Sequence, residues 1–206
     1  MQSKIVLIRQ GITTGNVRKL YYGKTDVPLA DKGIEQLKEL SAKGIYPTSD
    51  TAEYYTSGML RTEQTLEIIY GKREHDVIED LRELDFGIFE MKSYEELEGN
   101  PDYEAWITAT DESFTPPKGE SIMNFKKRVQ AGFNELLVRH ELLMLKLRNR
   151  EKEAMSICIC HGGVISGILN NIWPERYDYF YSWIPDPGHG YVLTMEDGRI
   201  VGDERF

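Results

Sequence analysis

Apolar residues along the chain gather into short β-branched runs separated by longer amphipathic stretches. Residues 4–9, 52–57 and 155–160 are compact apolar runs, which is typical of buried strands. Apolar positions three or four apart predict a helix from near Asp31, with Asp31 as its N-cap, through Leu37 and Leu40, and another over about 60–69. This order predicts an α/β fold, a three-layer α/β/α sandwich with a largely parallel central sheet.

The second half of the chain predicts a long amphipathic helix over about 121–150, because its apolar or part-apolar positions share one face. Those positions are Phe125, Val129, Phe133, Leu136, His140, Leu143 and Leu147. After strand 155–160 we expect an apolar helix to about Trp173. Residues 191–195 and 199–201, joined around Asp197-Gly198, predict a β-hairpin. We find no linker, and expect one domain over residues 1–206.

Residues 93–120 predict short helical pieces, since Pro101, Pro116 and Pro117 break the pattern. We expect this segment to be an insertion or cap over a site near the sheet. It is rich in aromatic residues: Tyr94, Tyr103, Trp106 and Phe114. They either accept a ring or an apolar alcohol of a ligand or bury a small core of their own, and both readings stay open.

Composition excludes some classes of partner. The 206-residue chain carries a net charge of −9, which disfavours nucleic acid and anionic membrane surfaces. It has no apolar run of about 18 residues and no signal-peptide pattern, so we expect a soluble cytoplasmic protein. Cys158 and Cys160 lie on one face of a predicted strand and are expected to be buried, reduced thiols. The sequence predicts no metal site, since no second ligand pair accompanies them.

Polar residues follow the predicted strands at their carboxyl ends. Arg9-Gln10-Gly11 follows the first strand and His161-Gly162-Gly163 follows the third. Glycines there let a ligand approach the backbone and leave amide donors for an anion. Arg61 lies on the first turn of a predicted helix, where a guanidinium can bind phosphate oxygens bidentately, and Asn16 offers an amide donor. These features predict a phosphate site.

Taken together, these motifs resemble the histidine phosphatase superfamily, with its phosphoglycerate mutase-like fold. Arg9-x-Gly-x-Thr-x-x-Asn16 resembles the Arg-His-Gly signature, and Ser57-x-x-x-Arg61-Thr-x-Gln-Thr resembles the second signature. The segments 25–29 and 85–90 are similar to those of broad-specificity and α-ribazole phosphatases. Where the family carries the histidine that becomes phosphorylated, this chain has Gln10.

The resemblance implies roles for further residues. Glu83 matches the general acid/base carboxylate, with Asp80, Asp85 and Glu90 as nearby rivals. Arg9, Asn16, Arg61 and His161 match the groups that hold the phosphoryl oxygens, and Gly23, Lys24 and Thr25 match the loop at the mouth of the substrate pocket. No cofactor or metal is implied, because two arginines and the second histidine supply the charge stabilisation.

Gln10 divides the functional hypotheses. An amide is a poor nucleophile, so we expect a phosphomonoester hydrolase that acts on a small-molecule phosphate ester and is inactive or strongly impaired. A natural non-catalytic phospholigand-binding or protein-interaction module and a phosphoglycerate mutase-type phosphotransferase are the alternatives. The otherwise intact set of residues favours an enzyme with its nucleophile replaced. A homodimer through the hairpin and an aromatic tail near Trp183 and Phe206 is possible, and His189 is expected in a turn rather than in the pocket.

Overall fold

The computed structural model describes residues 2–148, 152–177 and 179–206. A six-stranded sheet has the order β3-β2-β4-β1-β5-β6. Its strands are β1 (Gln2–Arg9), β2 (Ala52–Thr56), β3 (His75–Val77), β4 (Met155–Cys160), β5 (Gly190–Glu196) and β6 (Arg199–Arg205). Strands β1 to β4 are parallel to one another. Strand β5 pairs antiparallel with β1, and β6 pairs antiparallel with β5. The predicted α/β class and largely parallel sheet are confirmed.

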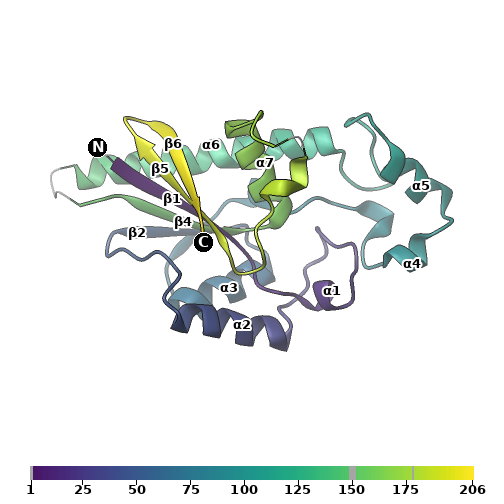
Figure 1. The fold of residues 1–206 in the computed structure, drawn as a ribbon, viewed down its shortest axis with the longest axis horizontal. Helices are drawn as coiled ribbons and strands as arrows, with labels where there is room; N and C mark the ends of the chain where they lie inside the picture. The colour runs from purple at the N-terminus through teal and green to yellow at the C-terminus, as the bar shows by residue number, and fades with distance from the viewer. Residues whose placement is uncertain (1, 149–151, 178) are drawn as a thin grey trace.

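Alternating side chains of the central strands fill two cores, one on each face of the sheet. Ile5 and Leu7 point to the face covered by α6 (Ile122–Leu147) and α7 (Gly162–Ile172). Val6 and Ile8 point to the face covered by α2 (Asp31–Ala42) and α3 (Leu60–Tyr70). Figure 1 shows the sheet between these two pairs of helices. The two cores make three layers, as the hydrophobic pattern predicts.

Several element boundaries differ from the predictions. Asp31 is not an N-cap: it is the first residue of α2, and Ala30 occupies the cap position without a side-chain hydrogen bond. The backbone N–H of Ala30 donates to the carbonyl of Ile12, which fixes the chain before the helix. Helix α6 begins as predicted, with Ser121 as its N-cap, but its predicted end at Arg150 lies outside the described residues. The short α1 (Thr14–Val17) and edge strand β3 were not predicted.

The segment 93–120 holds α4 (Tyr94–Leu97) and α5 (Pro101–Thr108), which lie away from the sheet in Figure 1. Two of its four aromatic side chains, Tyr103 and Trp106, pack against Phe89, Tyr21 and Phe86 from the preceding segments. Phe114 and Tyr94 are exposed. Half of the segment's aromatic residues therefore belong to a small core that joins it to residues 21 and 86–89, and the other half are exposed.

The C-terminal part contains the predicted hairpin of β5 and β6. The expected exposed aromatic tail is wrong for Trp183, which is 1% exposed and belongs to the core on the α6 and α7 face. Its ring stacks on Trp173, and Phe206 packs edge-on against Tyr46. Trp183 therefore offers no surface to a partner, whereas Phe206 is partly exposed, and the homodimer stays a prediction. Within the part of the chain that the structure describes, no helix is long and apolar enough to cross a membrane.

Candidate active site

The carboxyl ends of three adjacent parallel strands bring four of the predicted residues together. Arg9 ends β1 and Gln10 follows it, while His161 follows the neighbouring strand β4. The backbone N–H of Gln10 donates to the carbonyl of Cys160 over 3.0 Å, so the pairing of β1 with β4 continues to the site. Arg61 enters from α3, after β2 on the other side of β4. The parallel sheet thus determines the convergence.

His161 is fully buried and stands at the centre of this group. Its Nδ1 lies 3.3 Å from Nε of Arg61, which donates to it, and 3.1 Å from the amide oxygen Oε1 of Gln10. Its Nε2 lies 2.8 Å from Oγ of Ser57. Since the Arg61 N–H points at Nδ1, that atom is the acceptor, and the proton of a neutral imidazole is on Nε2.

The other hydrogen bonds fit this tautomer. The Nε2–H of His161 donates to Ser57, the Ser57 hydroxyl donates to Oγ1 of Thr62 over 3.2 Å, and Thr62 donates to the carbonyl of Met59 over 2.7 Å. An unprotonated Nδ1 would repel the amide oxygen of Gln10. This tautomer therefore requires the Gln10 amide to be turned over, so that its NH₂ takes the place of Oε1 beside the imidazole.

Electrostatics also favour the neutral imidazole. Burial lowers the pKa of His161 well below its usual value, and the positive charges of Arg61, Arg128, Arg9 and Arg82 lower it further. In this state neither ring nitrogen of His161 has a proton free for a phosphate oxygen. The predicted donor role of His161 thus requires a proton to be added at Nδ1 or the Arg61 contact to move.

Arg61 is fully buried, and much of its guanidinium is already bound. Nη2 donates to the carbonyl of Gly23 over 2.7 Å, and Nη1 donates to the carbonyl of Thr25 over 3.1 Å. The same loop is held from its other side by Glu90, whose carboxylate accepts the backbone N–H groups of 23–25 at 3.0 to 3.2 Å. Each terminal nitrogen of Arg61 retains one further N–H for an anion, so its bidentate use stays a prediction.

Arg9 has more free donor capacity. Its Nη1 donates to the carbonyl of Pro185 over 2.7 Å, while its buried Nε has no hydrogen-bond partner among the described residues. Burial lowers the pKa of Arg9, and the negative charge of Glu83 opposes that shift. The guanidinium passes close to Gly162, where an added Cβ would lie 3.2 Å from Nε. A side chain at this position would be in tight contact with the guanidinium, and glycine at the start of α7 avoids that contact.

Glu83 closes the group from a fourth loop. Its Oε2 accepts the backbone N–H of Gly163 over 3.0 Å, and its Oε1 accepts the N–H of Leu84 over 3.0 Å. A Cβ on Gly163 would lie 2.5 Å from Oε1, so glycine is needed for the carboxylate to reach the N-terminus of α7. One of the amide donors that the His161-Gly162-Gly163 motif offers to an anion is therefore taken by Glu83.

Two of the three rival carboxylates are engaged with other groups. Glu90 holds the backbone of loop 23–25 and also accepts the N–H of Phe86 over 3.0 Å. Asp85 pairs with Lys24 at 2.9 Å and accepts the N–H of Gly87. Glu83 is the carboxylate that contacts the N-terminus of α7 beside His161. Asp80, the third rival, lines the same cavity as Glu83, and the acid/base role of Glu83 stays a prediction.

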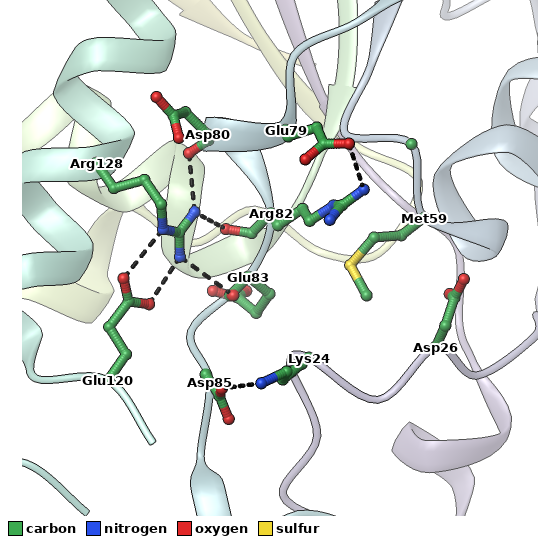
Figure 2. A pocket seen from close by; sticks show the side chains of 11 residues that line it. Lys24, Asp26, Met59, Glu79, Asp80, Arg82, Glu83, Asp85, Glu120 and Arg128 are labelled. Carbon is green, nitrogen blue, oxygen red and sulfur yellow. Dashed lines mark hydrogen bonds and ion pairs between the residues drawn. The ribbon is translucent and has the colours of Figure 1, made fainter. Parts of the chain in front are cut away.

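A cavity of about 540 Å³ opens beside this buried group (Figure 2). Glu83 belongs to the buried group and also lines the cavity, whereas Gln10 and His161 do not line it. Its walls are mostly charged, and Met59 is the one large apolar side chain among them. They comprise Lys24, Asp26, Gly58, Met59, Glu79, Asp80, Arg82, Glu83, Asp85, Glu120 and Arg128. Of the predicted mouth residues, Lys24 lines this cavity, while Gly23 and Thr25 bind Arg61 through their carbonyls.

The side chain of Asn16 is engaged in the turn that begins α1, and its phosphate-binding role stays a prediction. Its Oδ1 accepts the backbone N–H of Thr13 over 3.0 Å in the capping box of α1. Thr13 in turn donates to the hydroxyl of Tyr22 over 2.6 Å. The centre of the Tyr22 ring lies 5.3 Å from Cζ of the Arg61 guanidinium, which stacks over it. Asn16 is thus joined to the site through Thr13 and Tyr22.

Three residues of the site were not predicted as site residues: Ser57, Tyr22 and Arg128. Ser57 and Tyr22 are within the motifs that carry the resemblance, so position in a motif was the available signal. Arg128 had no such signal, because an arginine on the polar side of a long helix looks like an ordinary surface residue. His189 lies in a turn, as expected, and its backbone N–H donates to the carbonyl of Asp186.

The two thiols are free and buried, as expected. Among the described residues, no group of three or more histidine, cysteine or acidic side chains is placed to hold a metal ion. The buried positive charge of the site comes from Arg9 and Arg61, whose pKa values are both lowered by burial and raised again by Glu83.

Comparison with known proteins agrees with this geometry. Probable phosphoglycerate mutase GpmB of Proteus mirabilis is 33% identical over 144 residues, or 67% of this chain and 65% of that relative. The adenosylcobalamin/alpha-ribazole phosphatase of Escherichia coli is 29% identical over 170 residues, or 74% of this chain and 82% of that relative. The chain thus spans just under two thirds of the first relative's length.

Solved structures show the same fold. The putative alpha-ribazole-5'-P phosphatase of Escherichia coli has a TM-score of 0.75 at 22% identity, covering 99% of this chain and 94% of that one. Bacillus stearothermophilus YhfR has a TM-score of 0.76 at 23% identity, covering 97% of this chain and 94% of that one. The family model of the histidine phosphatase superfamily (branch 1) matches residues 5–204. Because this model matches nearly the whole length of the chain, the chain belongs to the histidine phosphatase superfamily.

Proposed function

We propose that this chain is a phosphomonoester hydrolase of the histidine phosphatase type whose nucleophile position is occupied by Gln10. The observation that carries the proposal is the place of Gln10. It follows β1, 4% exposed, with its amide 3.1 Å from His161 and the Arg61 guanidinium against the same imidazole nitrogen. A histidine at this position would lie in a site that already contains two arginines, Arg9 and Arg61, and the carboxylate of Glu83.

The proposed reaction of a histidine at position 10 has two steps. The imidazole nitrogen attacks phosphorus, the bond from phosphorus to the ester oxygen breaks, and Glu83 gives its proton to the departing alkoxide. Water, losing a proton to Glu83, then attacks the phosphohistidine and releases inorganic phosphate. Arg9 and Arg61 stabilise the charge of the transferring group. The amide of Gln10 can donate a hydrogen bond but cannot form the covalent intermediate.

The central test is the substitution Gln10→His, assayed with p-nitrophenyl phosphate over long incubations. Removal of a covalent nucleophile costs on the order of 10⁴ to 10⁶ in rate, so the substitution should raise kcat/KM by about four orders of magnitude or more. Gln36→His, at a helix position of α2, is the matched control and should leave the activity of the chain unchanged. Equal, negligible activity in all three proteins would exclude the phosphatase proposal.

A second candidate function is a phospholigand-binding module without turnover. It is favoured by the same amide, since Gln10 fits the site without disturbing its hydrogen bonds. Inorganic phosphate titrated calorimetrically into the unmodified chain tests it, with Arg9→Gln as the variant that should lose binding. Phosphorus NMR of Gln10→His with an added alcohol distinguishes a third possibility, a mutase-type phosphotransferase, since transfer would give a new ester instead of free phosphate.

The cavity beside Glu83 supports a small polar phosphate ester as the ligand. Its charged walls suit an alcohol that carries hydrogen-bonding groups rather than a lipid or an unsubstituted aromatic ring. The names of the relatives, an alpha-ribazole phosphatase and a probable phosphoglycerate mutase, are both consistent with a polar ester. Gln10→His should therefore turn over a polar alkyl phosphate, such as glycerol phosphate, more efficiently than a phosphate ester of a long-chain alcohol.

A further inference from the structure

We propose that Arg128 is a positioning residue for the acid/base carboxylate: its guanidinium, locked by Glu120, fixes the backbone that carries Glu83 against the N-terminus of α7. This inference rests on the proposed function for its catalytic consequence. The hydrogen bonds that carry it, between Arg128 and the loop of residues 79–85, do not depend on that function. Figure 2 shows the arginine with its acceptors around it at one wall of the cavity.

The first observation is that Arg128 binds the loop backbone rather than its side chains. Nη1 donates to the carbonyls of Asp80 and Arg82, both over 2.9 Å, and Nη2 donates to the carbonyl of Glu83 over 3.4 Å. One planar group thereby fixes the peptide units on both sides of Glu83. The peptide units leading into Glu83 consequently follow the position of the guanidinium.

The second observation is that Glu120 holds the guanidinium in place. Nε of Arg128 donates to Oε1 over 3.0 Å, and Nη2 donates to Oε2 over 2.7 Å, which makes a bidentate pair. The backbone N–H of Glu120 also donates to the carbonyl of Asp85 over 2.9 Å. Arg128 of α6 therefore holds the loop before Glu83, through the Arg82 carbonyl, and Glu120 holds it after Glu83, through the Asp85 carbonyl.

The third observation excludes a direct role in binding substrate. A guanidinium has five N–H donors, and these five hydrogen bonds use all of them. Although Arg128 lines the cavity, it has no donor left for a phosphate or for an alcohol. Its effect on catalysis must pass through the groups it holds, and Glu83 is the one that contacts α7.

The packing under the loop supplies a separate anchor, so loss of Arg128 should loosen the loop without unfolding it. Leu81 is fully buried against α6, where a Cβ on Gly132 would lie 2.9 Å from its Cδ2. Arg82 adds a bond from Nε to the carbonyl of Ser57 over 3.2 Å. The substitution Arg128→Gln should consequently retain the fold, which circular dichroism checks.

The first test measures backbone protection in the chain as it exists, by amide hydrogen exchange followed residue by residue. Arg128→Gln should speed exchange at Gly163, whose N–H donates to Glu83, by about tenfold, as expected for the loss of one hydrogen bond of roughly 1.4 kcal/mol. Arg139→Gln is the matched control, since Arg139 lies on the same helix and pairs with Asp76 and Glu135 far from this loop. Unchanged protection at Gly163 in Arg128→Gln would overturn the proposal.

The second test uses turnover in the Gln10→His background and compares two leaving groups. A general acid contributes about 10² to 10⁴ for a poor leaving group and much less for p-nitrophenolate, so Glu83→Gln should slow glycerol phosphate far more than p-nitrophenyl phosphate. Arg128→Gln should show the same selectivity at about tenfold, and adding it to Glu83→Gln should cost nothing further. Arg128→Lys, which keeps one charge but cannot span the acceptors, should not restore the rate.

Equal losses on both substrates, or additive losses in the double variant, would overturn the positioning role and identify Arg128 as merely structural. If Gln10→His shows no turnover with either ester, the proposed phosphatase function fails. The exchange experiment then decides the positioning of Glu83 by itself, because it needs neither substrate nor activity.

Discussion

At the scale of single residues, the site is organised by which atom carries each proton. His161 accepts from Arg61 and donates to Ser57, so its neutral form fits every neighbour. The Ser57 hydroxyl donates a hydrogen bond to Thr62, and each donor in this chain of hydrogen bonds has an acceptor. The fixed tautomer explains why Gln10 is accommodated: its amide NH₂ can face the same unprotonated nitrogen.

Removal of the Ser57 hydroxyl should destabilise the protein. Ser57→Ala leaves the buried Nε2–H of His161 without an acceptor, which costs about 1 to 3 kcal/mol of unfolding free energy. Urea denaturation of both proteins measures it. Ser41→Ala is the control, because the buried Oγ of Ser41 has no hydrogen-bond partner in the described residues and should cost little. Equal effects of the two substitutions would contradict the assigned hydrogen bonds.

At the scale of elements, loops from different parts of the chain are tied to one another through their backbones. Loop 23–25 is held on one side by Glu90, which accepts its N–H groups, and on the other by Arg61, which donates to its carbonyls. The loop between 79 and 85 is held in the same manner by Arg128. Charged side chains act here as supports for backbone and not as surface ion pairs.

Glu90→Gln tests that support. An amide offers one oxygen where the carboxylate offers two, and its NH₂ would oppose the N–H groups of 23–25, so we expect a loss of about 1 to 3 kcal/mol. Hydrogen exchange at Gly23 and Thr25 should accelerate in parallel. Glu98→Gln, at an exposed position after α4, serves as the comparison. Protection at 23–25 that survives the substitution would show that Arg61 alone holds the loop.

At the scale of the whole molecule, buried histidines link stability to pH. His140 is fully buried on α6, between the hydroxyls of Ser156 at 2.9 Å and Ser3 at 2.8 Å. Burial lowers the pKa of His140 from 6.5 to about 4, with Glu53 opposing the shift. The folded protein therefore keeps this ring neutral over a range of pH in which the unfolded chain protonates it.

The sign of the pH dependence follows from that difference. Below about pH 6.5 the unfolded chain takes up the proton first, so stability falls as the pH falls, and the loss reaches about 3 kcal/mol near pH 4. Urea unfolding at several pH values measures this slope. His140→Gln should be less stable at neutral pH but flatter across this range, whereas His75→Gln, at a partly exposed site, should keep the slope. An unchanged slope in His140→Gln would contradict the assignment.

The sequence predicted the parts of the fold that depend on local pattern. Short apolar runs predicted strands β1, β2 and β4, and a three-to-four spacing predicted α6 with His140 on its buried face. The edge strand β3 was missed because three residues carry too little periodicity to be recognised. Trp183 was misplaced because aromatic content alone does not say which face of a tail is covered.

What the sequence by itself determined is the set of chemical groups, their order, and their place at strand ends: Arg9 and Gln10 after β1, Arg61 after β2, and His161 after β4. Parallel strands must bring such ends to one edge of a sheet, so their meeting was predictable. Only the tertiary structure decided which donors are already used. Hydrogen bonds between residues far apart in sequence engage most of Arg61, give one amide of α7 to Glu83, and place Arg128 behind it, because each depends on a distance that no local pattern encodes.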